Sequence, residues 1–465
     1  MSLHARGAAA AARGLRAREF SSTELVHALL DRIDEVDPRV RAMRQVLAEE
    51  ALRAAADADR RLVTGAPTGP LDGVPFTVKD NLDVAGSATT QGVRAFAGAI
   101  APVDAPAVAH LRRAGGIPLA RTNMPDFALR WHTDSQIAGP TLNPWDPALT
   151  PGGSSGGEAV ALATGMTPLG VGNDLGGSLR WPAQCNGIAS LRPTLGRIPH
   201  ALSLEPTAKP LSLQFIEVQG PLARGVEDLR LAFGLMCAPD TRDPWHVALP
   251  ADHVPTTPRR VRVADDLPGL DPPVRAAVAR AATALEEQGY EIADASGPSL
   301  QAAAVLWPHI MSADGRRLWP EVAPLASAEA GRFMDAVLAL TDPQDLDTMG
   351  RVFTERQRLG RSWSEHQAHT PLVIAPIATR VPFRAGDDLD GVPAARRIIE
   401  SLCPTLAVNV LGLPSVAVPV GVIDGLPQAV QVIGPRFGEA LCLDAAEAIE
   451  RAAARMTPVT PAPQS

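Results

Sequence analysis

The sequence predicts an α/β protein in which helices cover both faces of a mixed, mostly parallel sheet. Segments with apolar residues at helical spacing alternate with short apolar runs of strand length. Two glycine-rich loops, at 152–157 and 174–180, follow or precede such elements. With 465 residues and 46% hydrophobic side chains, the chain is long enough to bury a large core in one domain.

The first 65 residues are predicted to be helical. Ser21 and Glu24 form a capping box, in which a hydroxyl precedes a glutamate by three positions at a helix start. Apolar residues then recur at helical spacing until Pro38, where we expect the helix to end. Residues 44–63 predict a second, alanine-rich helix.

Residues 66–235 are expected to form the catalytic core. Four prolines and five glycines between 139 and 157 indicate an ordered loop, because this composition cannot propagate a helix. The predicted strands of this part cover 74–78, 117–120 and 168–172, and its predicted helices cover 106–114 and 158–164.

Residues 240–370 are less regular and are interpreted as an insertion that shapes a pocket. They carry four of the seven tryptophans, and helices are predicted near 273–288, 326–341 and 350–361. Residues 371–456 complete the core, with strands at 372–377, 415–420 and 429–433 and a helix at 439–454. We expect the proline-rich tail at 457–465 to be disordered.

Composition excludes several classes of function. A net charge of −8 without a basic cluster argues against nucleic-acid binding, and no apolar run reaches the length of a membrane span. The four cysteines are scattered and the ten histidines form no metal motif, so we expect no metal site. Reduced thiols are typical of a cytoplasmic protein, which is the predicted location.

Lysine is almost absent from the chain. Only two of its 43 basic Lys and Arg residues are lysines, Lys79 and Lys209. Lysine can lose its proton when buried, whereas arginine stays charged. Lys79 ends the apolar, strand-like run at 74–78, which could lower its pKa far enough for a general base.

Serines on the two glycine loops complete the requirements for acyl transfer. Ser178 follows two glycines and is the preferred nucleophile, and a hydroxyl of Ser154 or Ser155 could pass its proton to Lys79. Asp174 and Arg180 predict an ion pair that holds the second loop rigid. Backbone N–H groups of this loop are the predicted oxyanion hole: Leu175, Gly176, Gly177 and Ser178.

The glycine loops also fit other structures. The loop at 152–157 could cradle a phosphate or act as a linker, but it lacks the Gly-Lys-Ser/Thr ending of a P-loop and lies between predicted elements. It also fits the G-x-S-x-G elbow with Ser155 as nucleophile, yet no strand directly precedes it. Residues 170–172 lack the third glycine of a dinucleotide site.

Taken together, these residues resemble the amidase signature family along nearly the whole chain. The resemblance implies Ser178 as the acylated nucleophile, Ser154 after a cis peptide bond as the proton bridge, and Lys79 as the terminal base, supported by Ser155. It also implies a single α/β domain with a sheet of about eleven mixed strands and no cofactor. The matching stretches are 71–80, 143–146, 151–158, 172–182, 191–197, 220–224, 412–414 and 425–434.

Three aromatic positions depart from the family's usual pattern. Trp131 and His132 replace small residues before the first glycine loop, and Trp181 stands where a branched aliphatic residue is common. We predict that all three line the substrate pocket, with plain packing as the open alternative.

The predicted function is an amidohydrolase that cleaves a linear amide, carbamate or urea C–N bond in a small molecule through an acyl-enzyme. The alternative is the glutamine-hydrolysing component of a tRNA-dependent amidotransferase, which would need a partner protein. A catalytically silent binding protein is a third option, which the complete set of Lys79, Ser154 and Ser178 disfavours. The oligomeric state is open, a homodimer included.

Overall fold

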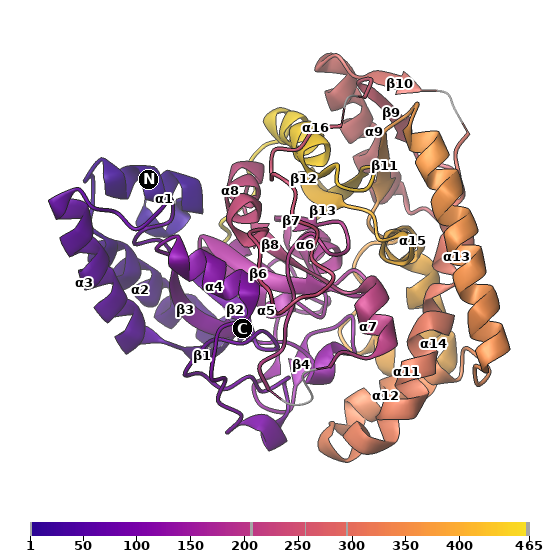
Figure 1. The fold of residues 1–465 in the computed structure, drawn as a ribbon, viewed down its shortest axis with the longest axis horizontal. Helices are drawn as coiled ribbons and strands as arrows, with labels where there is room; N and C mark the ends of the chain where they lie inside the picture. The colour runs from indigo at the N-terminus through magenta and orange to yellow at the C-terminus, as the bar shows by residue number, and fades with distance from the viewer. Residues whose placement is uncertain (1, 205–207, 256, 294–295, 462–465) are drawn as a thin grey trace.

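The computed structural model describes residues 2–204, 208–255, 257–293 and 296–461, and one central sheet runs through it (Figure 1). Eleven strands lie in the order β1-β3-β2-β6-β8-β7-β12-β13-β11-β9-β10, and β4 (Asp134–Ser135) with β5 (Gly139–Pro140) forms a separate pair. The sheet strands are β1 (Met43–Val46), β2 (Pro75–Lys79), β3 (Ile117–Thr122), β6 (Leu169–Asp174), β7 (Ala189–Arg192), β8 (Val218–Ala223), β9 (Arg260–Val263), β10 (Glu291–Ala293), β11 (Leu372–Pro376), β12 (Ser415–Ile423) and β13 (Leu426–Ile433).

The strand number and the mixed sheet are confirmed, but the expectation of mostly parallel strands is wrong. The four parallel pairings are β2 with β3, β2 with β6, β9 with β10 and β9 with β11. The other six neighbouring pairs of the described sheet are antiparallel. One of them is a hairpin, in which only Asp424 and Gly425, both with positive φ, connect β12 to β13.

Helices cover both faces of the sheet, and Figure 1 shows α1–α3 at the β1 end and α11–α14 at the opposite side of the molecule. One hydrophobic core lies beneath α1–α4, α8, α9 and α16, and the second lies beneath α6 and α10–α15. The helices are α1 (Ala8–Arg16), α2 (Ser22–Val40), α3 (Ala48–Thr64), α4 (Pro106–Arg113), α5 (Gly156–Ala163), α6 (Arg180–Asn186), α7 (Leu211–Ile216), α8 (Val226–Met236), α9 (Pro272–Glu287), α10 (Leu300–Ala304), α11 (Trp307–Val322), α12 (Ala328–Leu338), α13 (Leu346–Gln367), α14 (Gly391–Ser401), α15 (Cys403–Leu411) and α16 (Glu439–Ala452).

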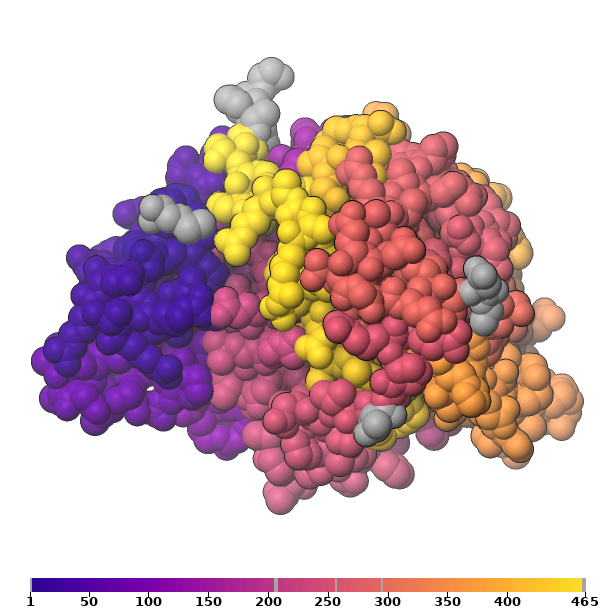
Figure 2. All heavy atoms as spheres, turned by 90° about the horizontal axis from the view of Figure 1, so that it is seen from above, coloured from indigo at the N-terminus to yellow at the C-terminus, as the bar shows by residue number. Residues whose placement is uncertain are grey.

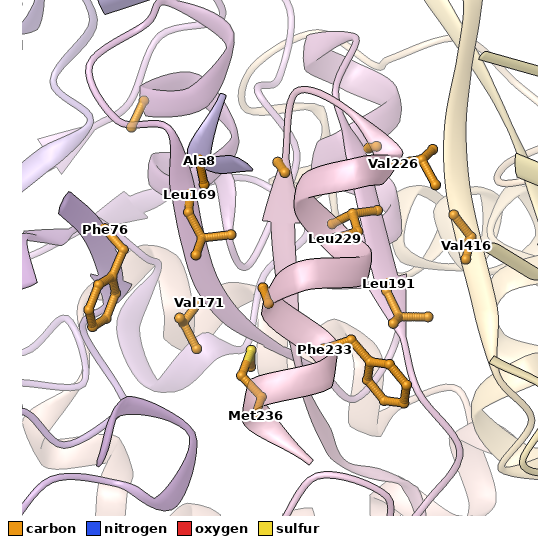
Figure 3. Close-up of a cluster of buried hydrophobic side chains, with 14 of the residues drawn as sticks. Ala8, Phe76, Leu169, Val171, Leu191, Val226, Leu229, Phe233, Met236 and Val416 are labelled. Carbon is orange, nitrogen blue, oxygen red and sulfur yellow. The ribbon is translucent and has the colours of Figure 1, made fainter. Parts of the chain in front are cut away.

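On the face of the sheet that α8 covers, packing follows from the alternation of side chains along each strand. Figure 3 shows Leu229, Phe233 and Met236 of α8 directed toward strand residues that include Val171 and Leu191. Since successive side chains of a strand point to opposite faces, the polar residues between these apolar ones face the second layer of helices. That second face carries the functional residues described below.

In the N-terminal region the capping box is confirmed, but the predicted end of its helix and the predicted start of the next helix are wrong. Ser21 Oγ accepts a hydrogen bond from the Glu24 backbone N–H, and Glu24 accepts one from the Ser21 backbone. The helix passes Pro38 and ends at Val40. The next predicted helix starts later than expected, because Met43–Val46 pairs with β3 as an edge strand.

Part of the C-terminal tail is ordered, contrary to expectation. The Val459 N–H donates to the carbonyl of Ala163, and Arg32 and Arg39 of α2 donate to the carbonyls of Val459 and Pro461. Figure 2 shows this yellow C-terminal segment beside the indigo N-terminal helices. The remaining tail residues, 462–465, lie outside the described residues.

No helix among the described residues is long and apolar enough to cross a membrane.

Candidate active site

Lys79 is the last residue of β2 and is completely buried. Phe76 and Val78 point into the first core, so Thr77 and Lys79 point to the opposite face, against α5. Burial lowers the pKa of Lys79 from 10.5 to about 7, although nearby carboxyl groups act in the opposite direction. The lysine can therefore be neutral near physiological pH.

The three predicted catalytic residues form one continuous chain of contacts. Lys79 Nζ lies 2.7 Å from Ser154 Oγ, and Ser154 Oγ lies 3.0 Å from Ser178 Oγ. Ser154 and Ser178 are both buried, with Ser178 retaining 7% exposure. A proton on Ser178 can thus reach Lys79 through one intervening hydroxyl.

The first glycine loop brings Ser154 between the other two residues. The Gly153–Ser154 peptide bond is cis, as the family resemblance implies. A Cβ on Gly153 would lie only 2.5 Å from the carbonyl oxygen of Arg130, so no larger residue fits there. The loop then runs directly into α5 at Gly156.

Asp174 organises the second loop from the end of β6. Its carboxylate accepts hydrogen bonds from the backbone N–H groups of Gly177 and Leu179 and forms the expected ion pair with Arg180 at 3.0 Å. Burial alone would raise the pKa of Asp174, but Arg180 and Arg192 outweigh it and hold the pKa well below its usual range. The loop is therefore held in place by a buried ion pair and two backbone hydrogen bonds to the same carboxylate.

The predicted oxyanion hole needs one correction, at Gly177. Its N–H donates to Asp174 at 2.8 Å and so is not free to bind an oxyanion. Within the described residues, no protein acceptor is recorded for the N–H groups of Leu175, Gly176 and Ser178. These three remain candidates for the oxyanion hole.

Comparison with known proteins places this geometry in a family. A family model described as Amidase matches residues 24–443. The chain belongs to the amidase family. It is 40% identical over 452 residues to the indoleacetamide hydrolase of Bradyrhizobium diazoefficiens, covering 95% of this chain and 85% of that protein. This protein is an amidase that hydrolyses a linear amide.

Two further matches are more distant. The A component of the glutamyl-tRNA(Gln) amidotransferase of Alkalilimnicola ehrlichii is 32% identical over 486 residues, covering 95% of this amidase and 96% of that protein. A solved structure of 6-aminohexanoate cyclic dimer hydrolase with substrate has a TM-score of 0.84 at 26% identity, covering 97% and 98% of the two chains.

The pocket of the amidase opens at Ser178. A cavity of about 300 Å³ reaches from Ser178 and Gly176 toward α11 and α12. Two tryptophans in its wall hold the second glycine loop, because Trp307 Nε1 donates to the carbonyl of Leu175 and Trp131 Nε1 to that of Gly176. Its aromatic lining consists of Phe127, Trp131, Trp307, Trp319 and Phe333.

Of the three aromatic residues expected in the pocket, only Trp131 lines it. Trp181 lies behind Trp131, donates from Nε1 to its carbonyl and stacks on Phe383. His132 is buried with Nδ1 3.1 Å from Thr150 Oγ1, and burial with the nearby Arg130 lowers its pKa to about 4. Both side chains pack behind the pocket wall, so the expectation is wrong for them.

The expected support from Ser155 is also not seen. Its Oγ is buried and has no hydrogen-bond partner among the described residues. Ser155 precedes α5 without capping it.

Sequence reasoning missed three polar residues around Lys79. Asn173 Oδ1 lies 2.5 Å from Lys79 Nζ, and Asn173 in turn donates to Glu217. Glu158 of α5 accepts from Thr77 at 2.6 Å, and burial raises its pKa to about 8. One signal could have revealed Glu158: it is the sole charged residue in α5.

Proposed function

We propose that this amidase hydrolyses the primary amide of a flat aromatic acyl group, with indole-3-acetamide as the first candidate, to the carboxylic acid and ammonia. The observation that carries the proposal is the tryptophan-lined cavity that opens at Ser178. The similarity to an indoleacetamide hydrolase supports the same substrate class.

In the proposed mechanism, Ser178 Oγ attacks the amide carbon while its proton moves to Ser154 Oγ and the Ser154 proton moves to neutral Lys79. The distances of 3.0 and 2.7 Å along this path allow direct transfer. The N–H groups of Leu175, Gly176 and Ser178 stabilise the developing oxyanion.

The intermediate collapses in the reverse direction. Lys79 returns its proton through Ser154 to the leaving nitrogen, the C–N bond breaks and ammonia departs from the acyl-enzyme. Water then attacks the ester, and its proton follows the same path to Lys79. The carbon–oxygen bond to Ser178 breaks, Ser178 regains a proton and the carboxylic acid leaves.

The cavity favours an aromatic acyl group for a physical reason. The rings of Trp131 and Trp307 lie 5.6 Å apart, and Phe333 approaches Trp131 edge-on at 5.8 Å. Such walls stabilise a planar aromatic ring by burial and by edge or offset contacts.

The charged residues of the cavity already have partners, which disfavours free glutamine as substrate. Arg130 forms a two-pronged ion pair with Asp388, and Asp314 accepts from the Ser212 backbone. The ammonium and carboxylate of glutamine would need oppositely charged groups to replace water. The amidotransferase alternative therefore has less support.

The test is ammonia release from a panel of amides by the purified single chain. The panel contains indole-3-acetamide, phenylacetamide, butyramide, glutamine, an aryl carbamate and an aryl urea, with Ser178→Ala as the inactive control. We expect the highest kcat/KM with indole-3-acetamide and at least roughly a 1000-fold loss in Ser178→Ala. A preference for glutamine or for butyramide would overturn the aromatic assignment.

A further inference from the structure

The two lysines of the chain lie at the ends of one series of polar contacts, which is buried at Lys79 and partly buried at Lys209. Asn173 Oδ1 lies 2.5 Å from Lys79 Nζ, and Asn173 Nδ2 donates to Glu217 Oε1 at 2.7 Å. Glu217 Oε2 is 3.3 Å from His200 Nδ1, and the same nitrogen is 3.1 Å from Lys209 Nζ. The proposed mechanism uses only Lys79 of these residues.

Strand register brings this series together. Asn173 is on β6, and Glu217 immediately precedes β8, the antiparallel neighbour of β6. Because Asp174 pairs with Val218, Glu217 is held diagonally across from Asn173. Asn173 is 5% exposed and the Glu217 side chain 9% exposed, so water competes little for these hydrogen bonds.

The carboxylate determines which way the asparagine amide faces. A carboxylate only accepts hydrogen bonds, so the NH₂ group of Asn173 must face Glu217 and its oxygen must face Lys79. A neutral lysine has two N–H bonds and one lone pair. When one N–H donates to Asn173 Oδ1, the lone pair can turn toward Ser154, from which it must take a proton.

We infer that Asn173 and Glu217 are positioning residues that aim the lone pair of Lys79 at Ser154, and that His200 holds Glu217 in place. The inference rests on the proposed proton path through Ser154. It extends that path by two groups that lie outside the substrate cavity, of which Asn173 contacts Lys79 Nζ and Glu217 contacts Asn173.

Glu217 also acts on the charge of Lys79. Burial lowers the pKa of Lys79 most, and Glu217, Asp174 and Glu158 oppose it in that order. Asp174 is neutralised by its ion pair with Arg180, and burial raises the pKa of Glu158 to about 8. Because Glu217 is the carboxyl that raises the pKa of Lys79 most, its removal should change the titration of Lys79.

At the far end, His200 is the contact through which the second lysine reaches Glu217. Burial lowers the pKa of His200 to about 4, Glu217 opposes this and Lys209 adds to it, with smaller effects from Asp243 and Asp83. Neutral His200 can accept from Lys209 at Nδ1 or donate from Nδ1 to Glu217, but one nitrogen cannot do both. Only the tautomer that carries its proton on Nδ1 lets His200 donate to Glu217, and this is the tautomer that the inference requires.

The experiment measures kcat and KM for indole-3-acetamide from pH 5 to 10 in wild type, Asn173→Ala, Glu217→Gln and Glu217→Asp. Neither Asn173 nor Glu217 lines the substrate cavity. We therefore expect kcat to fall roughly 10- to 100-fold with little change in KM. Lys79 would no longer be aligned with Ser154, while the contacts with the substrate would remain.

The two Glu217 variants separate geometry from charge. Glu217→Gln removes a charge that raises the pKa of Lys79, so the acid limb of kcat/KM should move to lower pH. Glu217→Asp keeps the charge and shortens the side chain. The pH at which kcat/KM begins to fall should therefore stay the same, while its maximum value should decrease. Glu450→Gln is the matched control, since it removes a half-buried carboxylate that instead accepts from Val226; it should leave plateau and limb unchanged.

The outcomes distinguish this inference from the proposed function. Full kcat with an unmoved acid limb in Glu217→Gln and Asn173→Ala, while Ser178→Ala is inactive, overturns only the positioning role. Full activity of Lys79→Ala would overturn the proposed proton path itself. If Asn173→Ala does not fold, the Glu217 pair decides the matter, because that side chain lies at the edge of the buried region.

Discussion

At the scale of single residues, burial decides what Lys79 can do. The ammonium group has no ion-pair partner within salt-bridge distance among the described residues, and its nearest polar contacts are the oxygens of Ser154 and Asn173. Desolvation disfavours the charged form of such a group. Burial thus allows this lysine to be neutral near pH 7, as the proposed role of proton acceptor requires.

The activity should accordingly show an acid limb near pH 7. Lys79 must be neutral to accept the Ser178 proton, and burial lowers its pKa to about 7, so kcat/KM rises with pH through this value. Initial rates with indole-3-acetamide across pH 5–10 measure it. Lys79→Arg should be inactive throughout, because arginine does not lose its proton in this range. A flat profile down to pH 5 would contradict the assignment.

Trp307 is expected to serve both the pocket and the oxyanion loop. Trp307→Phe keeps an aromatic wall but loses the hydrogen bond from Nε1 to the carbonyl of Leu175. Loss of one buried hydrogen bond is worth about 1 kcal/mol, so we expect kcat to fall up to roughly tenfold while KM changes little. Trp307→Ala also removes the wall and should raise KM for indole-3-acetamide. Equal kinetics in both variants would refute the dual role.

At the scale of elements, the step from β6 to α6 depends on one carboxylate. The Asp174 carboxylate accepts hydrogen bonds from two backbone N–H groups and from the guanidinium of Arg180, and it is completely buried. The short loop cannot hold Ser178 in place through apolar contacts alone, because glycines occupy two of its positions. The ion pair therefore fixes the loop.

Asp174→Asn should strongly destabilise the fold. It leaves the buried Arg180 without its countercharge, which typically costs about 3–5 kcal/mol. Denaturant unfolding followed by circular dichroism measures the loss. Asp444→Asn is the matched control, since it breaks an exposed pair with Arg230 and should cost less than about 1 kcal/mol. Similar losses in the two variants would argue against the anchor.

Strand direction is the element-level property that the sequence predicts least well. The buried strands near Lys79 are expected to be parallel because helices separate them, and three of them are parallel neighbours. The antiparallel part includes β7 and β8, whose short apolar runs carry no clear local strand signal. Their placement depends on pairing with distant segments, such as β12 with β7, which no local pattern encodes.

At the scale of the whole molecule, two buried histidines link stability to pH. The pKa values of His132 and His200 fall from 6.5 to about 4, for each mainly through burial. Between these values the unfolded chain binds protons that the folded chain does not, so their contribution is present above pH 6.5 and is lost as the pH falls toward 4.

We therefore expect the free energy of unfolding to fall between pH 6.5 and 4. Urea unfolding at half-unit steps measures the slope. Other buried groups titrate in the same interval, so the informative comparison is wild type against His132→Gln. The His132 side chain contacts Thr150 and does not line the substrate cavity. The variant should show a shallower slope over this interval. Identical slopes would show that His132 does not resist protonation in the fold.

The sequence by itself predicted the α/β class, the capping box and the candidate set of Lys79, Ser154 and Ser178. These features depend on local chemistry: glycine loops, a rare lysine after an apolar strand, and a hydroxyl before a glutamate. Only the tertiary structure decided which groups surround that set. The Gly177 N–H donates to Asp174, Trp181 lies behind the pocket, and Glu217, next to β8, contacts Asn173 on the neighbouring strand β6. Burial and contacts between distant segments set these relations, because they arise only when the sheet assembles.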